Sequence, residues 1–185
     1  MKHAGTKTLE TNRLVLRRFE ESDATAMYQN WAGDPQVTKY LMWPTHENIE
    51  VSAKVLKNWS DLYENTDYYH WAITVKAHGT EPIGSIAVMR QDDLTKMAHI
   101  GYCLGRAWWR QGITSEALKT VIHYLFTTVG VNRIESRHTP DNPNSGKVMQ
   151  KCGMTLEGVM RESDWNNQGI CDACMYAVLR KEYRG

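Results

Sequence analysis

A segment between a predicted strand and a predicted helix has the composition of a phosphate-binding turn. Residues 97–104 have the length and composition of a strand, and residues 112–125 place apolar side chains at the spacing of an amphipathic helix. Gly112 stands where the helix begins, and there the first N–H groups lack partners within the helix and the dipole is positive. Such a helix start binds phosphate without a cationic side chain. An ordinary strand-to-helix connection has the same pattern, so the turn alone leaves both interpretations open.

Helical segments dominate the first third of the chain. The predicted elements are a flexible tail at 1–8, a strand at 13–19, a helix over about 22–31, a short helical piece at 34–41, and a longer helix from Thr45 to about 64. Ser22 or Asp23 caps the first helix, and Asp34 before Pro35 is the start signal of the short piece.

Strands dominate the remainder and frame the phosphate-binding turn. The predicted elements are strands at 69–76, 83–90 and 96–104, a helix from Gly112, a strand at 133–138, a helix at 144–152, and strands at 154–164 and 170–179. Tight turns make the first three of these strands antiparallel, and Gly153 ends the second helix. The order βααβββαβαββ predicts an α/β mixed sheet with helices on both faces, in a single domain covering 9–185.

Composition excludes several classes of protein. The 185 residues include 22 Lys plus Arg against 21 Asp plus Glu, and the charges are spread along the chain. This argues against nucleic acid or an anionic membrane as a partner held by charge. No apolar stretch is long enough to span a bilayer, and residues 1–8 lack the apolar core of a signal peptide. We therefore expect a cytoplasmic protein.

The four cysteines predict neither a disulfide nor a metal site. Cys171 and Cys174 form a CxxC, but in a strand residues three apart point to opposite faces and lie about 10 Å apart. A zinc site needs a second pair, and the spacing of Cys103 and Cys152 does not supply one. All four are expected to be reduced thiols.

Three separated motifs together resemble one enzyme family. They are Thr11-Asn12-Arg13-Leu14-Val15-Leu16-Arg17, then Ile100-Gly101-Tyr102 with Trp109-Arg110-Gln111-Gly112 and Glu116-Ala117, and last Asn142-Pro143-Asn144-Ser145 with Lys151-Cys152-Gly153-Met154. Their order and spacing resemble the GCN5-related N-acetyltransferase (GNAT) superfamily. Within it the chain looks most like the RimJ/RimL-like branch of ribosomal-protein alanine N-acetyltransferases. Trp109 and Thr114 depart from the usual phosphate-turn pattern, and the tryptophan looks ordinary for this branch.

The resemblance implies transfer of an acetyl group from acetyl-CoA to a primary amine, by direct attack in a ternary complex. For this branch the acceptor implied is the N-terminal α-amine of a protein. A small amine (a polyamine, an amino acid or an aminoglycoside) and a non-catalytic acyl-CoA-binding module are the alternatives. Acetyl-CoA and an amine acceptor are the implied partners, without metal, nucleic acid or membrane, and whether the protein forms a homodimer is left open.

The resemblance also assigns the cofactor-binding residues. In this fold the strand at 97–104 separates from the strand at 133–138, and the pantetheine arm lies in the gap. The implied contacts are backbone groups of Tyr102, Cys103 and Leu104, the turn residues Arg110, Gln111, Gly112, Ile113, Thr114 and Ser115, and then Asn142 and Ser145. Arg110 could equally be a solvated loop residue, and Asn142 could serve only as a helix cap. Thr114 could bond a phosphate or the helix backbone.

Three side chains are the catalytic candidates. Ser145 matches a position near the cofactor sulfur, where its hydroxyl would donate a hydrogen bond to the leaving thiolate. The resemblance implies His99 and Asp164 as candidate bases, because His99 stands where several relatives carry a glutamate and Asp164 matches an acidic position near the acceptor site. An α-amine titrates near 7.7–8.0 and needs only about 1.4 kcal/mol to become neutral at pH 7, so a weak base such as histidine suffices. Each could instead be structural, and His138 is a further candidate. Cys103 is expected to be a structural thiol rather than an acyl carrier.

Four aromatic residues belong either to an acceptor wall or to the core. They are Trp31, Tyr40, Trp43 and Trp165. Loops and helix ends carry them in the predicted fold, and aromatic walls could hold a peptide N-terminus or the apolar body of an amine.

Overall fold

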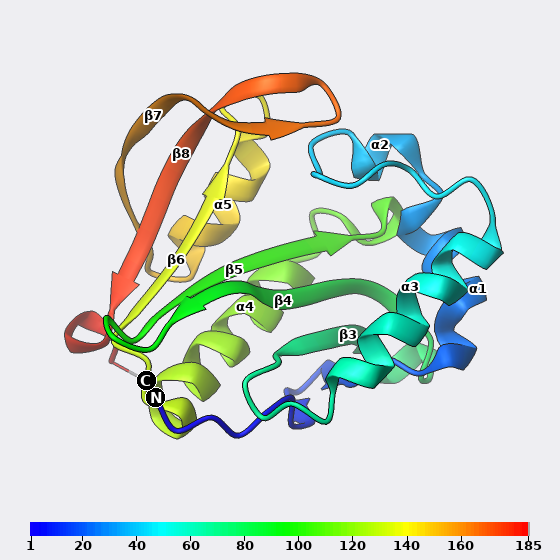
Figure 1. The fold of residues 1–185 in the computed structure, drawn as a ribbon, viewed down its shortest axis with the longest axis horizontal. Helices are drawn as coiled ribbons and strands as arrows, with labels where there is room; N and C mark the ends of the chain where they lie inside the picture. Colours follow the sequence, from blue (N-terminus) through cyan, green and yellow to red (C-terminus); the bar gives the residue numbers. More distant parts are fainter. Residues whose placement is uncertain (185) are drawn as a thin grey trace.

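The fold is an eight-stranded mixed sheet with helices on both faces, in a computed structural model that describes residues 1–184 (Figure 1). The strands are β1 (Leu9–Glu10), β2 (Leu14–Arg17), β3 (His70–Val75), β4 (Pro82–Asp92), β5 (Met97–Leu104), β6 (Arg133–His138), β7 (Thr155–Asn166) and β8 (Gly169–Leu179). The α-helices are α1 (Ala24–Met27), α2 (Pro35–Thr38), α3 (Ile49–Leu62), α4 (Ile113–Tyr124) and α5 (Pro143–Lys151). The α/β class and the mixed sheet predicted from the sequence are confirmed.

The sheet divides between β5 and β6. Its order is β1-β2-β3-β4-β5-β6-β8-β7, and the β5–β6 pair is parallel whereas all the others are antiparallel. That parallel pair extends only from Met97–Arg133 to His99–Glu135. One step further the Ser136 hydroxyl donates to the Ile100 carbonyl at 2.8 Å, where a ladder bond would otherwise lie. Beyond this point the two strands separate, as the resemblance implied.

Each face of the sheet has its own hydrophobic packing. Helix α4 places Leu118, Val121 and Ile122, all at most 1% exposed, in the main core cluster beside strand residues such as Ile100 and Ile134. On the other face α1 and α3 enclose a second cluster that contains Met27, Trp31 and Leu56. Packing on both faces makes the strands rigid enough to hold the site.

Some local expectations were wrong. Thr45 does not open the long helix: Asn48 caps α3 by accepting a hydrogen bond from the Val51 N–H, at 3.1 Å. The intervening segment is held out of the helix because the His46 N–H bonds the Ala32 carbonyl and its ring bonds Ser52. The region 21–32 is a 3₁₀ turn, a short α-helix and a π turn rather than one regular helix.

Residues 1–8 lie against the domain, although the sequence predicts a flexible tail. The Lys2 N–H donates to Val129, the Gly5 N–H donates to Thr66, and the Trp71 indole donates to the Lys7 carbonyl. Each of these long-range hydrogen bonds involves a backbone group, and amino-acid composition does not predict such bonds. Residue 185, the last of the predicted domain, lies outside the described residues. Within 1–184 no helix is long and apolar enough to cross a membrane.

Candidate active site

The turn before α4 has the backbone geometry of an anion-binding loop. Arg110 and Gly112 have positive φ angles of 62° and 77°, and Gly112 occupies the N-cap position of α4. No side chain caps this helix, so the first N–H groups of α4 are available to a ligand. The left-handed conformation explains glycine at 112, because other residues adopt it at a steric cost. Arg110 adopts it as a non-glycine residue, which is uncommon and typical of functional loops.

Three residues from the first and second motifs brace this turn. The Arg13 guanidinium donates to the Gln111 carbonyl at 3.1 Å and forms an ion pair with Glu116 at 2.6 Å. The Thr11 hydroxyl donates to the other oxygen of the Glu116 carboxylate. Burial alone would raise the pKa of Glu116, and the bonds from Thr11 and Arg13 outweigh it and lower the pKa. The segment just before β2 thereby fixes the backbone that faces the pocket.

We expect the variant Arg13→Ala to weaken CoA binding roughly tenfold, because the turn loses its bond at Gln111 and its ion pair at Glu116. Isothermal titration with CoA measures this loss. Arg161→Ala is the matched control, because it removes one exposed arginine on β7 and leaves the turn intact. Equal affinities for the two variants would contradict a bracing role for Arg13.

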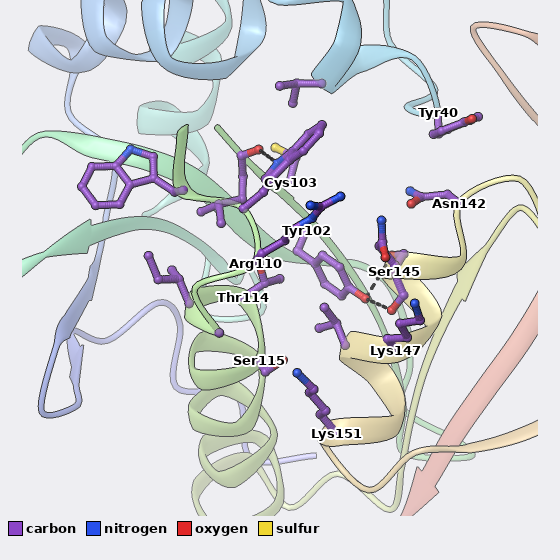
Figure 2. A pocket seen from close by; sticks show the side chains of 18 of the residues that line it. Tyr40, Tyr102, Cys103, Arg110, Thr114, Ser115, Asn142, Ser145, Lys147 and Lys151 are labelled. Carbon is purple, nitrogen blue, oxygen red and sulfur yellow. Dashed lines mark hydrogen bonds between the residues drawn. The ribbon is translucent and has the colours of Figure 1, made fainter. Parts of the chain in front are cut away.

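A pocket of about 580 Å³ opens at this turn (Figure 2). Its walls come from the end of β5, the turn, the first turn of α4, one side of α5 along its length, and the α2 segment. The predicted cofactor-binding residues on its wall are Tyr102, Cys103, Leu104, Arg110, Gly112, Ile113, Thr114, Ser115, Asn142 and Ser145. Gln111 is absent from the lining, because its side chain turns back to donate to the Ala107 carbonyl at 3.0 Å.

Tyr102 and Ser145 form a bonded pair across the pocket. The Tyr102 hydroxyl donates to the Ser145 carbonyl at 3.0 Å, and the Ser145 hydroxyl donates to the Tyr102 oxygen at 3.1 Å (Figure 2). Burial raises the pKa of Tyr102 well above its ordinary value, so the phenol stays protonated at neutral pH. The pair joins β5 to the first turn of α5 and holds the serine hydroxyl on the pocket wall.

Cys103 and Cys152 are poor nucleophiles. Burial raises the pKa of the Cys103 thiol to about 12 and that of Cys152 to about 11. Both side chains are therefore thiols rather than thiolates at neutral pH. Cys103 also packs against the cluster that contains Trp31. This environment suits the structural role expected from the sequence, and all four cysteines of the chain are free.

Sequence reasoning missed part of the pocket wall. The lining residues that the sequence analysis did not assign to a site are Val37, Leu41, Trp108, Trp109, Asn144, Lys147, Val148 and Lys151. Lys147 and Lys151 are four apart on α5, which places both ammonium groups on one face of the helix. That spacing of two lysines could have been recognised in the sequence. Nothing in the sequence of α2 indicates a pocket wall, because α2 approaches the pocket only through tertiary packing.

His99 lies outside the pocket lining, beside Glu135. The two residues are paired where β5 and β6 part, and His99 Nδ1 lies 3.3 Å from Glu135 Oε1. Their side chains are 12% and 8% exposed. Burial lowers the pKa of His99 more than Glu135 raises it, so the imidazole is neutral at pH 7. For Glu135, burial would raise the pKa, and bonds from His99 and Arg133 reverse the direction.

Asp164 and His138 also lie outside the lining. Asp164 forms an ion pair with Arg137 at 2.7 Å, between β7 and β6. His138 Nδ1 lies 2.7 Å from the Thr139 carbonyl, and its ring lies where a side chain at Gly146 would go. The structure therefore brings Ser145 together with the turn residues and leaves His99 and Asp164 at other places on the divided sheet.

The four aromatic residues have different environments. Trp31 is fully buried and belongs to the core. Trp43 is partly buried and its ring lies 5.3 Å from that of His46. Tyr40 lines the pocket, whereas Trp165 is 51% exposed on the β7–β8 hairpin. Of the two interpretations, the core therefore applies to Trp31 and the pocket wall to Tyr40.

Fold and pocket define an acyltransferase of the GNAT type, and the comparison with known proteins identifies the family. A model described as the acetyltransferase (GNAT) domain matches residues 13–155, so the chain belongs to this family and is an acetyl-CoA-dependent N-acetyltransferase. The chain is 35% identical to the ribosomal-protein-serine acetyltransferase of Escherichia coli K12, over 94% of this chain and 97% of that one.

Two further similarities agree. The chain is 34% identical to p20, an uncharacterised N-acetyltransferase of Bacillus licheniformis, over 97% of this chain and 99% of the relative. A solved ribosomal L7/L12 α-N-protein acetyltransferase in complex with coenzyme A superimposes with a TM-score of 0.82 at 24% identity, covering 94% of this chain and 98% of that one. The GNAT resemblance read from the three motifs is confirmed.

Proposed function

We propose that this N-acetyltransferase acetylates the N-terminal α-amine of a protein. The observation that carries the proposal is the pocket with the uncapped start of α4 at one end and the Tyr102–Ser145 pair beside it. The ribosomal-protein-serine acetyltransferase, related over nearly its whole length, supports this acceptor class. Acetyl-CoA supplies the activated acetyl thioester.

The residues present fit acetyl-CoA. The free N–H groups from Gly112 to Ser115 suit the pyrophosphate, and Lys147 and Lys151 add positive charge across the pocket from them. Where β5 and β6 part, residues 102–104 pair with β4 on one side only, so their backbone groups that point to the β6 side can bond the pantetheine amides. Asn142, at the N-cap of α5, has no side-chain capping bond, which leaves its amide for the same arm.

In this proposal Ser145 and His99 take part in the two proton transfers of the reaction. The amine nitrogen forms a bond to the acetyl carbon, the carbon–sulfur bond breaks, the nitrogen loses a proton and the sulfur gains one. The Ser145 hydroxyl, whose one hydrogen is donated to the Tyr102 oxygen in the structure, turns from that oxygen to donate to the departing thiolate. His99 donates through Nδ1 to Glu135, which leaves the Nε2 lone pair to accept the proton of the amine, directly or through water.

Asp164 is the second candidate base. Its carboxylate is engaged by the Arg137 guanidinium at 2.7 Å, so an incoming amine would have to compete with Arg137 for it. His99 is therefore the base we favour. An α-amine needs only modest help, because about 1.4 kcal/mol separates it from its neutral form at pH 7.

An acceptor screen tests the proposal. Release of free CoA thiol is measured with acetyl-CoA and peptides that begin with Ser or Ala, and with spermidine and kanamycin as small amines. Turnover with the peptides, but not with the same peptides blocked at the N-terminus, supports the proposal. Turnover confined to small amines would replace it with the small-amine alternative, and CoA binding without any turnover would favour a binding module.

The variant His99→Gln is expected to lower kcat/KM and to remove the acid limb of its pH profile. Activity of the wild type falls as the pH drops through the pKa of His99, which burial sets below the ordinary value of about 6.5. The profile is measured from pH 5 to 9 with one peptide. Ser145→Ala is the contrast: the rate falls while the limb stays. A limb unchanged in His99→Gln would exclude His99 as the base.

A further inference from the structure

Two segments far apart in the sequence are bonded together across the split in the sheet. Asn167, in the turn between β7 and β8, donates through its backbone N–H to the Leu41 carbonyl at 3.1 Å. Its side-chain Nδ2 donates to the carbonyls of Thr38 at 2.9 Å and Trp43 at 2.8 Å. We call these three bonds the clasp. Figure 1 shows the tip of the orange β7–β8 hairpin reaching the α2 segment.

A second connection lies beside the clasp. The Arg137 guanidinium on β6 pairs with Asp164 on β7 at 2.7 Å, and its Nη2 lies 3.8 Å from the Met42 sulfur. The Asp164 side chain is only 14% exposed, so this ion pair is partly shielded from water. Strands β6 and β7 and the segment at 38–43 are thereby connected at neighbouring points.

The clasp closes the open end of the split. The two half-sheets are joined at one end by the β5–β6 pairs and the Ser136–Ile100 bond. At the other end the hairpin is bonded to the α2 segment, which follows α1 on the β5 side of the split (Figure 1). The space between the strands is therefore bounded at both ends, and Tyr40 and Leu41, within the clasped segment, line the pocket.

We propose that Asn167 is a positioning residue that sets which acceptor amines reach the pocket. It acts through Tyr40 and Leu41, whose backbone is fixed by the clasp. A bounded opening admits an amine at the end of a slender extended chain, such as a peptide N-terminus, and obstructs a compact polycyclic amine. This inference rests on the proposed function and adds the element that selects the acceptor.

The test compares acceptors in variants of the clasp. Asn167→Asp has nearly the same shape but no N–H donor, and it places a carboxylate against two carbonyl oxygens. Gln168→Ala is the matched control, because Gln168 is the exposed neighbour in the same turn and its side chain is not part of the clasp. Kinetics are measured with a peptide that begins with Ser and with kanamycin, and CoA binding is measured by titration.

We expect Asn167→Asp to reduce the ratio of kcat/KM for peptide over kanamycin at least tenfold, mainly through a lower KM for kanamycin, because the opening is no longer bounded. CoA affinity stays within twofold, because the clasp lies at the other end of the pocket from α4. Asn167→Gln, which keeps the amide donors, restores part of the ratio, and Gln168→Ala leaves it unchanged. If Asn167→Asp folds poorly, the same ratio is read from Asn167→Ser, which keeps one donor.

Failure of this inference differs from failure of the proposed function. An unchanged peptide-to-kanamycin ratio in the variants, with peptide turnover in the wild type, overturns the role of the clasp alone. An equal fall in kcat with both acceptors also overturns the role of the clasp, because it indicates a general loss of structure. Absence of peptide turnover in the wild type overturns the proposed function as well.

Discussion

Replacing Thr114 by aspartate is expected to weaken CoA binding at least a hundredfold while the folded chain remains as stable as the wild type. Thr114 lines the pocket in the first turn of α4, where the backbone N–H groups are free. A carboxylate there repels a pyrophosphate, and two unit charges about 4 Å apart near a protein surface interact by about 4 kcal/mol. Yet an acidic side chain in the first helical turn stabilises the helix by about 0.3–1 kcal/mol.

The opposite signs of these two effects make the experiment decisive. Thermal unfolding without ligand measures stability, and unfolding with CoA measures binding. At a concentration that stabilises the wild type by about 2.7 kcal/mol, a variant that binds a hundredfold more weakly gains only about 0.4 kcal/mol. Thr114→Val serves as the neutral control and should bind CoA within about tenfold of the wild type. Undiminished CoA binding by Thr114→Asp would move the phosphate site away from α4.

Acidification is expected to destabilise the chain strongly through His70. This side chain is enclosed by Tyr68 and Ser85, bonded at 3.0 and 2.6 Å, and its ring lies 4.0 Å from that of Trp59. Burial lowers the pKa of His70 to about 3. The unfolded chain binds the proton near pH 6.5, so the stabilising contribution is complete above that pH and is lost as the pH falls toward 3.

The expected slope is about 1.4 kcal/mol of unfolding free energy per pH unit, with a total of roughly 5 kcal/mol. The variant His70→Gln has no group that titrates at this position, so its free energy of unfolding falls less steeply than that of the wild type between pH 6 and 4.5. This difference in slope is independent of how much the substitution itself destabilises the fold. Urea unfolding at a series of pH values measures the slopes. His123→Gln, at an exposed position on α4, is the control and should retain the wild-type slope. Parallel curves for His70→Gln and wild type would show that His70 titrates normally.

Local patterns were enough to find the turn at which we propose that the phosphates bind. Gly112 before an amphipathic helix, and Asn142-Pro143 before another, are signals of helix starts, and a helix start exposes N–H groups whatever the surrounding fold. The residues Tyr102 to Ser145 that the motifs assigned therefore reach one pocket, apart from Gln111. Gln111 does not line the pocket, because its side chain donates to a carbonyl four residues earlier. The spacing of the glycines does not predict this hydrogen bond.

The candidate bases were harder to place. Side chains along a strand alternate between the two faces of the sheet, and this alternation does not indicate which face lines a pocket. Tyr102 and His99 lie three apart on β5, so they face opposite sides of the sheet. Only the packing of α4 and α5 on the Tyr102 side shows that His99 turns toward Glu135 instead. Trp31 and Tyr40 show the same limit, since one enters the core and the other the pocket wall.

By itself the sequence determined membership of the GNAT family, the order of strands and helices apart from β1, and the position of the turn that we propose binds phosphate. These depend on local periodicity, helix-start signals and short motifs, which act over a few residues. Only the tertiary structure decided that Arg13 braces the turn, that α2 lines the pocket, and that Asn167 joins the hairpin to residues 38–43. The bonds of Arg13 and Asn167 link residues about 100 or more positions apart, and all of these contacts form only when elements distant in the sequence have packed together.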